Sequence, residues 1–226
     1  MYSKRCYKPP NAYNHRLKAS GIIPDVLSQF TPKLSIAVSW PASNTSAEIG
    51  NTLSPSAVQS KPNISFVAPT AHDISQSNIT ALKSDVQLTL ALTDPDAPSR
   101  ENPEWSQYLH WLVTGVPLVP LFALSNPALI AEASKNIQEL IEWKPPGPPP
   151  KTGKHRYVFV ALAPANQTTE KLELSVPTER QHWGYGGCKE DRRGLKDWAE
   201  ENGLVVVGEC DSCLRCVFAF ICVLDY

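Results

Sequence analysis

The stretch Leu88–Gly115, LTLALTDPDAPSRENPEWSQYLHWLVTG, places a segment rich in Asp, Pro and Arg between two apolar runs. In the first run Leu alternates with Thr or Ala, which is typical of a strand with one buried face. Pro95 and Pro98 cannot continue a sheet ladder, so this strand must end at Asp94. The second run, Tyr108–Val113, predicts another strand. The stretch therefore predicts two strands joined by a polar loop.

His110 lies in the middle of the second predicted strand, among aromatic and aliphatic neighbours. A buried imidazole needs a hydrogen-bonding partner or a ligand. Asp94 and Asp96, which follow the first strand, are the nearest candidates for that partner.

The composition indicates one large domain with a β-rich fold. Of the 226 residues 42% are hydrophobic, which is enough to close a core. The 21 prolines against 11 glycines favour strand ends and extended connections over a helical bundle. The net charge of -1 gives no overall field that would attract nucleic acid or an anionic membrane, so any anion recognition must be local.

The first 20 residues are polar and basic and lack the apolar segment of a signal peptide. The apolar run Val217–Leu224 is far shorter than the roughly 20 residues that a membrane-spanning helix needs. We expect a cytoplasmic protein that is not an integral membrane protein.

Hydrophobic periodicity predicts further elements along the chain. Strands are predicted at Leu34–Trp40, Ile64–Val67 and Arg156–Leu162, and helices at Leu195–Asn202 and, in short form, within residues 15–30. Residues 42–63 are either a long connection or a pair of short edge strands, and Ala131–Trp143 is either a short helix or an edge strand.

A proline-rich loop precedes the strand at Arg156–Leu162. Lys144–Lys154, KPPGPPPKTGK, contains five prolines, which remove hydrogen-bond donors and fix φ. We therefore expect a stiff, extended loop that leads to His155.

If the three strands at residues 88–93, 108–113 and 156–162 are neighbours, their polar side chains converge at one end of the sheet. This group comprises Asp94, Asp96, His110, His155, Arg156 and Tyr157. Imidazole donors and the backbone N–H groups of the proline-rich loop suit an anion, and a carboxylate can fix a histidine tautomer. Trp111, Pro149 and Tyr157 would form an apolar rim for the uncharged part of a ligand.

Structural roles for the same residues remain open at this point. A histidine on an apolar strand is often a satisfied core residue, and Asp94 and Asp96 could cap a turn. Arg100 and Arg156 could form structural ion pairs instead of binding an anion. The alternative function is a phosphate- or acyl-ester hydrolase that uses the His and Asp side chains, although no H-E-x-x-H, G-x-S-x-G or P-loop pattern occurs.

Three motifs together resemble the phosphatidylethanolamine-binding protein family. They are DPDAPSR at Asp94–Arg100, LHW at Leu109–Trp111 and GPPPKTGKHRYVF at Gly147–Phe159. The segments Ile22–Pro32 and LKDWAEENGL also resemble the family, so the similarity spans about residues 17–208. The Ser/Asn-rich connection at 42–63 and the basic N-terminal residues resemble the fungal carboxypeptidase Y inhibitor subgroup.

The resemblance implies a mainly β fold, with a central antiparallel sheet packed on a smaller second sheet and a few peripheral helices. It also implies a regulatory protein, not an enzyme, whose pocket binds phosphate-type anions or a phosphatidylethanolamine headgroup without a cofactor. The pocket residues that it implies are Asp94, Asp96, Pro98, His110, Trp111, Pro149, His155 and Tyr157. A serine carboxypeptidase or a signalling kinase would be the protein partner, and the chain would be a monomer.

The domain boundaries follow from the same resemblance. Residues 1–16 are expected to be a flexible lead, residues 17–208 a single domain, and residues 209–226 an atypical Cys-rich tail. Cys210, Cys213 and Cys216 have C-x2-C-x2-C spacing, but the spacing to Cys222 and the absence of a nearby His argue against a metal site.

Overall fold

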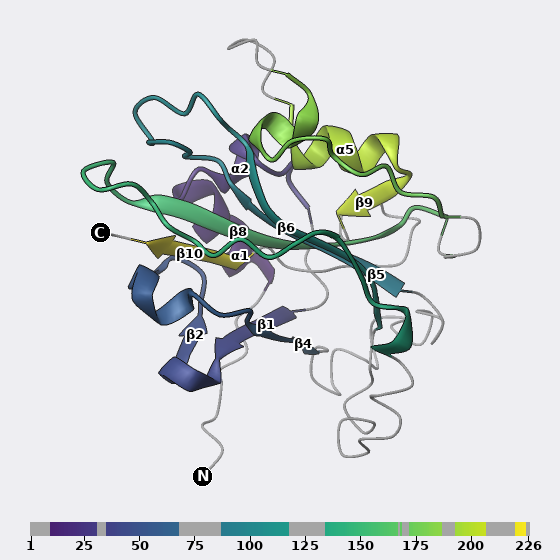
Figure 1. Ribbon diagram of the computed structural model, residues 1–226, viewed down its shortest axis with the longest axis horizontal. Helices are drawn as coiled ribbons and strands as arrows, with labels where there is room; N and C mark the ends of the chain where they lie inside the picture. Colours follow the sequence, from purple (N-terminus) through teal and green to yellow (C-terminus); the bar gives the residue numbers. More distant parts are fainter. Residues whose placement is uncertain are drawn as a thin grey trace.

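Two β-sheets of unequal size are stacked in the fold, and helices cover the outer face of the larger sheet (Figure 1). The computed structural model describes residues 10–30, 35–67, 87–117, 134–166, 168, 172–186, 193–206 and 220–224. The predicted fold class, mainly β with a central sheet on a smaller one and few helices, is confirmed.

The larger sheet has the strand order β3-β10-β8-β5-β6-β7, and β9 also pairs with β8. Its strands are β3 (Asn51–Leu53), β5 (Gln87–Asp94), β6 (Tyr108–Pro117), β7 (Gln138–Ile141), β8 (His155–Pro164), β9 (Leu204–Val206) and β10 (Phe220–Leu224). All pairs are antiparallel except β10 with β3, which is parallel.

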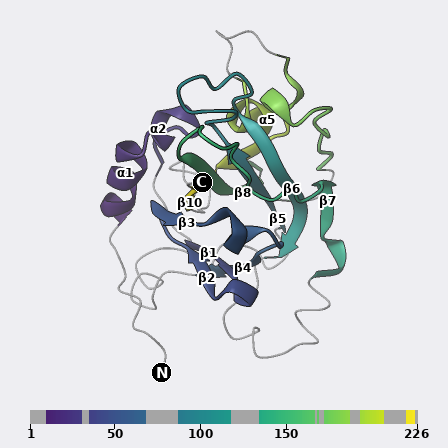
Figure 2. The same ribbon diagram turned by 60° about the vertical axis from the view of Figure 1, so that its left-hand side comes forward.

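The smaller sheet has the order β2-β1-β4, built from β1 (Ser35–Trp40), β2 (Thr45–Ala47) and β4 (Asn63–Val67). The helices are α1 (Pro10–Ala19), α2 (Ile22–Asp25) and α5 (Leu195–Glu201). Short 3-10 turns occur at η1 (Pro41–Ser43), η2 (Pro55–Val58), η5 (Ser134–Asn136) and η6 (Gln181–Gly184). Figure 2 shows α1 and α2 on one side of the molecule, with the smaller sheet beneath the larger one.

Strand β5 lies between β6 and β8, so the three strands that carry the candidate residues are adjacent as predicted. The prediction that β5 buries only one face is wrong. Leu88, Leu90 and Leu92 pack in the core between the two sheets, while Ala91 packs in a second core beneath the helices. Thr89 and Thr93 are also buried because helices cover the second face.

The segments with two predicted conformations adopt edge strands. Residues 42–63 contain β2 and β3, and β7 lies within Ala131–Trp143, of which residues 131–133 are outside the described part. Helix α5 confirms the prediction at Leu195–Asn202. Helix α1 begins at Pro10, inside the predicted flexible lead.

Part of the predicted Cys-rich tail contributes a strand to the larger sheet. The backbone of β10 pairs with β8 from Phe220 opposite Phe159 to Leu224 opposite His155, and with β3 on its other side. No sequence pattern predicted this pairing. Cys210, Cys213 and Cys216 lie outside the described residues.

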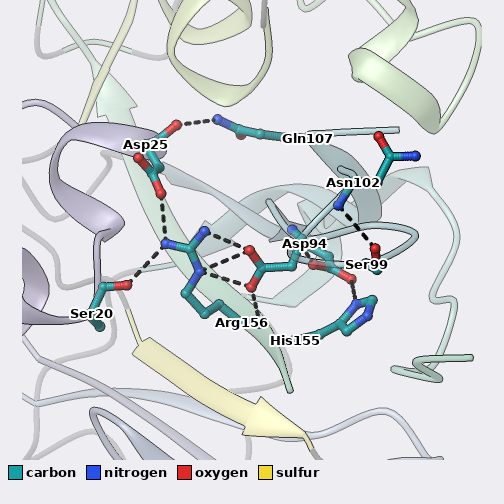
Figure 3. A network of polar contacts seen from close by, with 9 residues as sticks. Ser20, Asp25, Asp94, Ser99, Asn102, Gln107, His155 and Arg156 are labelled. Atoms are coloured by element: carbon teal, nitrogen blue, oxygen red, sulfur yellow. Dashed lines mark hydrogen bonds and ion pairs between the residues drawn. The ribbon is translucent and has the colours of Figure 1, made fainter. Parts of the chain in front are cut away.

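Arg156, on β8, binds segments that are far apart in the sequence (Figure 3). Its Nε and Nη2 donate to the two carboxylate oxygens of Asp96 at 2.9 and 2.6 Å, and its backbone N–H donates to the same carboxylate at 2.8 Å. Its Nη1 donates to the carbonyl of Ser20 at 3.0 Å and to Asp25 at 2.8 Å. One guanidinium therefore connects the sheet, the loop after β5 and the N-terminal helices.

The two carboxylates on Arg156 differ in burial, which makes them a matched test of this connection. The side chain of Asp96 is 2% exposed and that of Asp25 is 47% exposed. Asp96→Asn should lower the free energy of unfolding by about 3 kcal/mol, because it removes the buried negative charge that faces the Arg156 guanidinium. Asp25→Asn should lower it by about 0.5 kcal/mol, because water screens an exposed pair. Urea unfolding of both variants measures the difference, and equal losses would contradict this account.

A bulge in β6 requires Gly115. Strand β6 advances three residues, from Val113 to Val116, while β5 advances two, from Leu90 to Leu88. Gly115 has φ +73, and a Cβ there would lie 1.9 Å from the carbonyl oxygen of Asn136. The glycine thus allows both the left-handed backbone and the close approach of the segment before β7.

Gly115→Ala should lower the free energy of unfolding by about 3 kcal/mol, because it adds a collision with backbone to the strain of a positive φ. Gly153 is the matched control: its φ is +75, but a Cβ there would meet nothing within 4 Å. Gly153→Ala should therefore cost only about 1 kcal/mol. The midpoints of urea unfolding compare the two variants. If the two midpoints are indistinguishable, the backbone at Asn136 can move away from the added methyl group without loss of stability.

Candidate functional site

A cavity of ≈ 100 Å³ lies where the ends of β5, β6 and β8 meet the proline-rich loop. Six of the eight sequence-predicted site residues line it: Asp94, Pro98, His110, Pro149, His155 and Tyr157. The loop at Lys144–Lys154 supplies one wall, and the ends of the three strands supply the others. The convergence expected from the strand order is therefore present in the structure.

Asp96 and Trp111, the other two predicted residues, do not line the cavity. The carboxylate of Asp96 is occupied by Arg156, which confirms the structural ion pair among the two roles considered for that arginine. Trp111 packs in the core between the sheets, where its Nε1 donates to Glu139 at 2.8 Å. Its ring contacts Trp143 edge-on at 5.6 Å.

A second bulge in β6 sets the position of His110. Leu92 pairs with Trp111 and Thr93 pairs with Leu109, so His110 is the extra residue that has no partner in β5. A bulge of this kind re-aims a side chain that regular pleating would direct elsewhere. His110 reaches the cavity from this position, with the rings of Tyr108 and Tyr157 at 5.0 and 5.1 Å from its own.

The partner of His110 is the backbone carbonyl of Lys144, at 2.9 Å from Nδ1. The prediction that Asp94 or Asp96 would accept from it is wrong, because both carboxylates are occupied by other groups. A carbonyl oxygen can only accept, so Nδ1 carries the hydrogen and Nε2 of the neutral ring keeps a lone pair. Burial lowers the pKa of His110 to about 4, so the ring is neutral at pH 7.

Asp94 holds His155 instead, at 2.9 Å from Oδ2 to Nδ1 (Figure 3). Its other oxygen accepts from the backbone N–H of Asp96 at 2.7 Å, so the turn-capping role considered for Asp94 is also present. Both residues are buried, and burial raises the pKa of the Asp94 carboxyl although His155 opposes this effect.

The second ring nitrogen of His155 is also occupied. Thr152 donates its only hydroxyl hydrogen to the carbonyl of Pro149 at 2.7 Å, so Nε2 of His155 must donate to the Thr152 oxygen at 3.0 Å. With one further proton between His155 and Asp94, this pair is neutral overall. His155 is therefore a wall of the cavity whose donors are already used.

Sequence reasoning missed four lining residues: Ala97, Trp105, Tyr108 and Lys144. Gly147 also lines the cavity and belongs to the loop that was expected to offer backbone N–H groups. Lys144 is the most informative of the four. Its Nζ donates to the hydroxyl of Tyr108 at 2.8 Å and lies 5.1 Å from the centre of that ring. The sequence signal that could have identified it is a lysine at the start of the proline-rich loop. Trp105, 39% exposed, adds an aromatic surface beside Tyr108.

Two features are absent from the described residues. These residues contain no group of three or more His, Cys, Asp or Glu side chains placed to hold a metal ion. None of their helices has the length and apolar character needed to cross a membrane.

Comparisons with known proteins agree with this geometry. The family model for phosphatidylethanolamine-binding protein matches residues 43–207. The carboxypeptidase Y inhibitor of Saccharomyces cerevisiae is 32% identical over 199 residues, which cover 84% of this chain and 89% of the inhibitor. Protein BROTHER of FT and TFL 1 of Arabidopsis thaliana is 33% identical over 138 residues, which cover 61% of this chain and 62% of the relative.

Solved structures show the same similarity. A crystal structure of carboxypeptidase Y inhibitor complexed with its cognate proteinase matches with a TM-score of 0.72 and 26% identity, covering 96% of each chain. A phosphatidylethanolamine-binding protein from Plasmodium vivax shares the fold, with a TM-score of 0.63 and 20% identity over 96% of this chain and 98% of that one. This chain belongs to the phosphatidylethanolamine-binding protein family and resembles its carboxypeptidase Y inhibitor members.

Proposed function

We propose that this chain is a regulatory protein that binds a phosphate-type anion, such as a phosphorylated headgroup, in the cavity beside the proline-rich loop. The observation that carries the proposal is the charge balance of the lining. Among the described lining residues Lys144 is the one Lys or Arg and Asp94 is the one Asp or Glu. Asp94 is balanced by His155, whereas the described partner of Lys144 is a neutral hydroxyl. An anion would neutralise the remaining charge.

The size of the cavity supports a small headgroup. At ≈ 100 Å³ it is well below the roughly 300–1,000 Å³ of sites that enclose drug-sized ligands. The exposed ring of Trp105 and the proline-rich wall offer apolar surface at the rim for whatever the phosphate is attached to. A lipid or other large ligand would therefore insert its phosphate only.

Binding without turnover fits the lining better than ester hydrolysis. No Ser or Cys occurs among the eleven lining residues within the described part of the chain. His155 has both ring nitrogens engaged, so it is not free to act as a general base. The charge of Lys144 alone can attract an anion but cannot attack an ester while it is protonated.

Titration with inorganic phosphate, followed by NMR of the imidazole signals, tests the anion site. The His110 ring signals should shift and saturate. Lys144→Met should weaken binding about tenfold, because it removes a charge at the cavity. Lys196→Met, at an exposed position on α5, should leave affinity unchanged. Unmoved His110 signals, or equal affinities for the two lysine variants, would contradict the proposal.

We also propose that the chain inhibits a serine carboxypeptidase. The similarity to the yeast carboxypeptidase Y inhibitor extends over 84% of this chain and is not confined to the cavity loops. The match to the structure of the inhibitor in complex with its proteinase supports the same partner class.

Purified full-length protein should slow the hydrolysis of a peptide substrate by yeast carboxypeptidase Y, with inhibition that saturates as the protein concentration rises. Trypsin, a serine endopeptidase, is the control and should keep its full rate. Undiminished carboxypeptidase activity at a large molar excess of the protein would refute inhibition of this enzyme.

A further inference from the structure

The cavity presents a hydrogen-bond acceptor where an anion site would be expected to present a donor. Nδ1 of His110 donates to the carbonyl of Lys144, so the lone pair of the neutral ring is on Nε2. Within the described part of the chain no side chain or backbone group hydrogen-bonds Nε2, and the ring lines the cavity. A ligand that reaches this nitrogen meets an acceptor.

Two sets of contacts fix the orientation of the His110 ring and therefore its tautomer. The backbone N–H of Lys144 donates to the carbonyl of His110 at 2.9 Å, so the same two residues exchange two hydrogen bonds. The rings of Tyr108 and Tyr157 also pack against the imidazole, with centroids 5.0 and 5.1 Å away. Turning the His110 ring so that Nε2 faces the carbonyl of Lys144 would break these contacts.

The surrounding charges oppose a second proton on His110. Lys144 lies on the adjoining loop, Arg180 donates to the carbonyl of His110 at 2.9 Å, and His155 lies across the cavity. The carboxylate of Asp94, which lines the same cavity, is committed to His155 and to a backbone N–H. Burial is the main cause that lowers the pKa of His110 to about 4, and Lys144, Arg180 and His155 lower it further.

A phosphomonoester and a phosphodiester differ in the proton that they can bring. A monoester keeps an ionisable P–OH with a pKa of about 6, so it can donate to Nε2 at neutral pH. A diester has lost its only acidic proton and offers acceptors alone, so it would have to force a proton onto His110 or leave two acceptors facing each other. The diester therefore binds at a penalty that the monoester avoids.

We propose that the site selects phosphomonoesters over phosphodiesters, because His110 Nε2 accepts the hydrogen of the ligand's P–OH while Lys144 binds an unprotonated phosphoryl oxygen. This inference rests on the anion site proposed above and specifies its ligand class. The terminal phosphate could belong to a small metabolite or to a lipid that ends in a monoester. A phosphodiester headgroup such as that of phosphatidylethanolamine is disfavoured at neutral pH.

Phosphorylethanolamine and glycerophosphorylethanolamine are a matched pair, since they share phosphate and ethanolamine but differ in the second ester bond. Calorimetric titration of the full chain at pH 7 should show the monoester binding about tenfold more tightly or better. Its affinity should fall about tenfold per pH unit above roughly pH 6, as the P–OH is lost. Equal affinities for the two esters would overturn the inference and leave the anion site standing, whereas binding of neither would overturn both.

Two variants separate the acceptor from the local charge. His110→Gln places an amide that can donate without taking up a proton, so the preference for the monoester should fall to about threefold or less. Lys144→Met should weaken both esters by a similar factor and keep their ratio, because the backbone carbonyl that sets the tautomer remains. A ratio unchanged in His110→Gln would overturn the role of His110. If that variant does not fold, the pH dependence of monoester affinity in the wild type tests the same role of the P–OH proton.

Vesicle flotation identifies the source of the monoester. Recruitment to phosphatidic acid vesicles, but not to phosphatidylethanolamine vesicles, would support a lipid that ends in a monoester. Binding of phosphorylethanolamine with no recruitment to either vesicle would support a soluble phosphate compound. Recruitment to phosphatidylethanolamine equal to that seen with phosphatidic acid would contradict the preference.

Discussion

The ion pair between Arg156 and Asp96 is the contact on which the arrangement of the site depends. It is buried and bidentate, and the backbone N–H of Arg156 donates to the same carboxylate. Charges removed from water to this degree are tolerated only when their hydrogen bonds are satisfied, and here Ser20 and Asp25 complete the guanidinium. The loop after β5 is thereby held against the start of β8 and against the N-terminal helices.

Adjacent residues of a strand point to opposite sides, and this places two carboxylates of one loop in separate roles. On β8, Arg156 is directed toward the helices and binds Asp96, while His155 is directed toward the cavity and binds Asp94. The two aspartates of the D-P-D sequence that follows β5 thus bind the two residues of the H-R sequence on β8. The His155–Asp94 pair belongs to the cavity wall, and the Arg156–Asp96 pair fixes the position of that wall.

The chemistry of the cavity follows from how few of its groups remain uncommitted. His155 and Asp94 satisfy each other, so the ligand meets mainly the lone pair of His110 and the charge of Lys144. A buried neutral imidazole beside a cation is an unusual environment for a dianion but suits a singly protonated phosphate. The preference for a monoester is therefore a property of hydrogen-bond polarity, since the charge of Lys144 would attract either ester.

Alternation predicted β5, continuous apolar runs predicted β6 and β8, and proline positions predicted the loop at Lys144–Lys154, because these patterns are local in the chain. Strand convergence already gave seven of the eight candidate pocket residues and the resemblance to a known family added Pro98. Neither could distinguish Asp96 and Trp111, which have structural partners, from the residues that line the cavity. Only the tertiary structure decided the partner of His110, because a bulge in β6 and a carbonyl 34 residues away set its position and its tautomer. It also decided that both faces of β5 are buried and that Phe220–Leu224 joins the sheet, since each depends on segments distant in sequence.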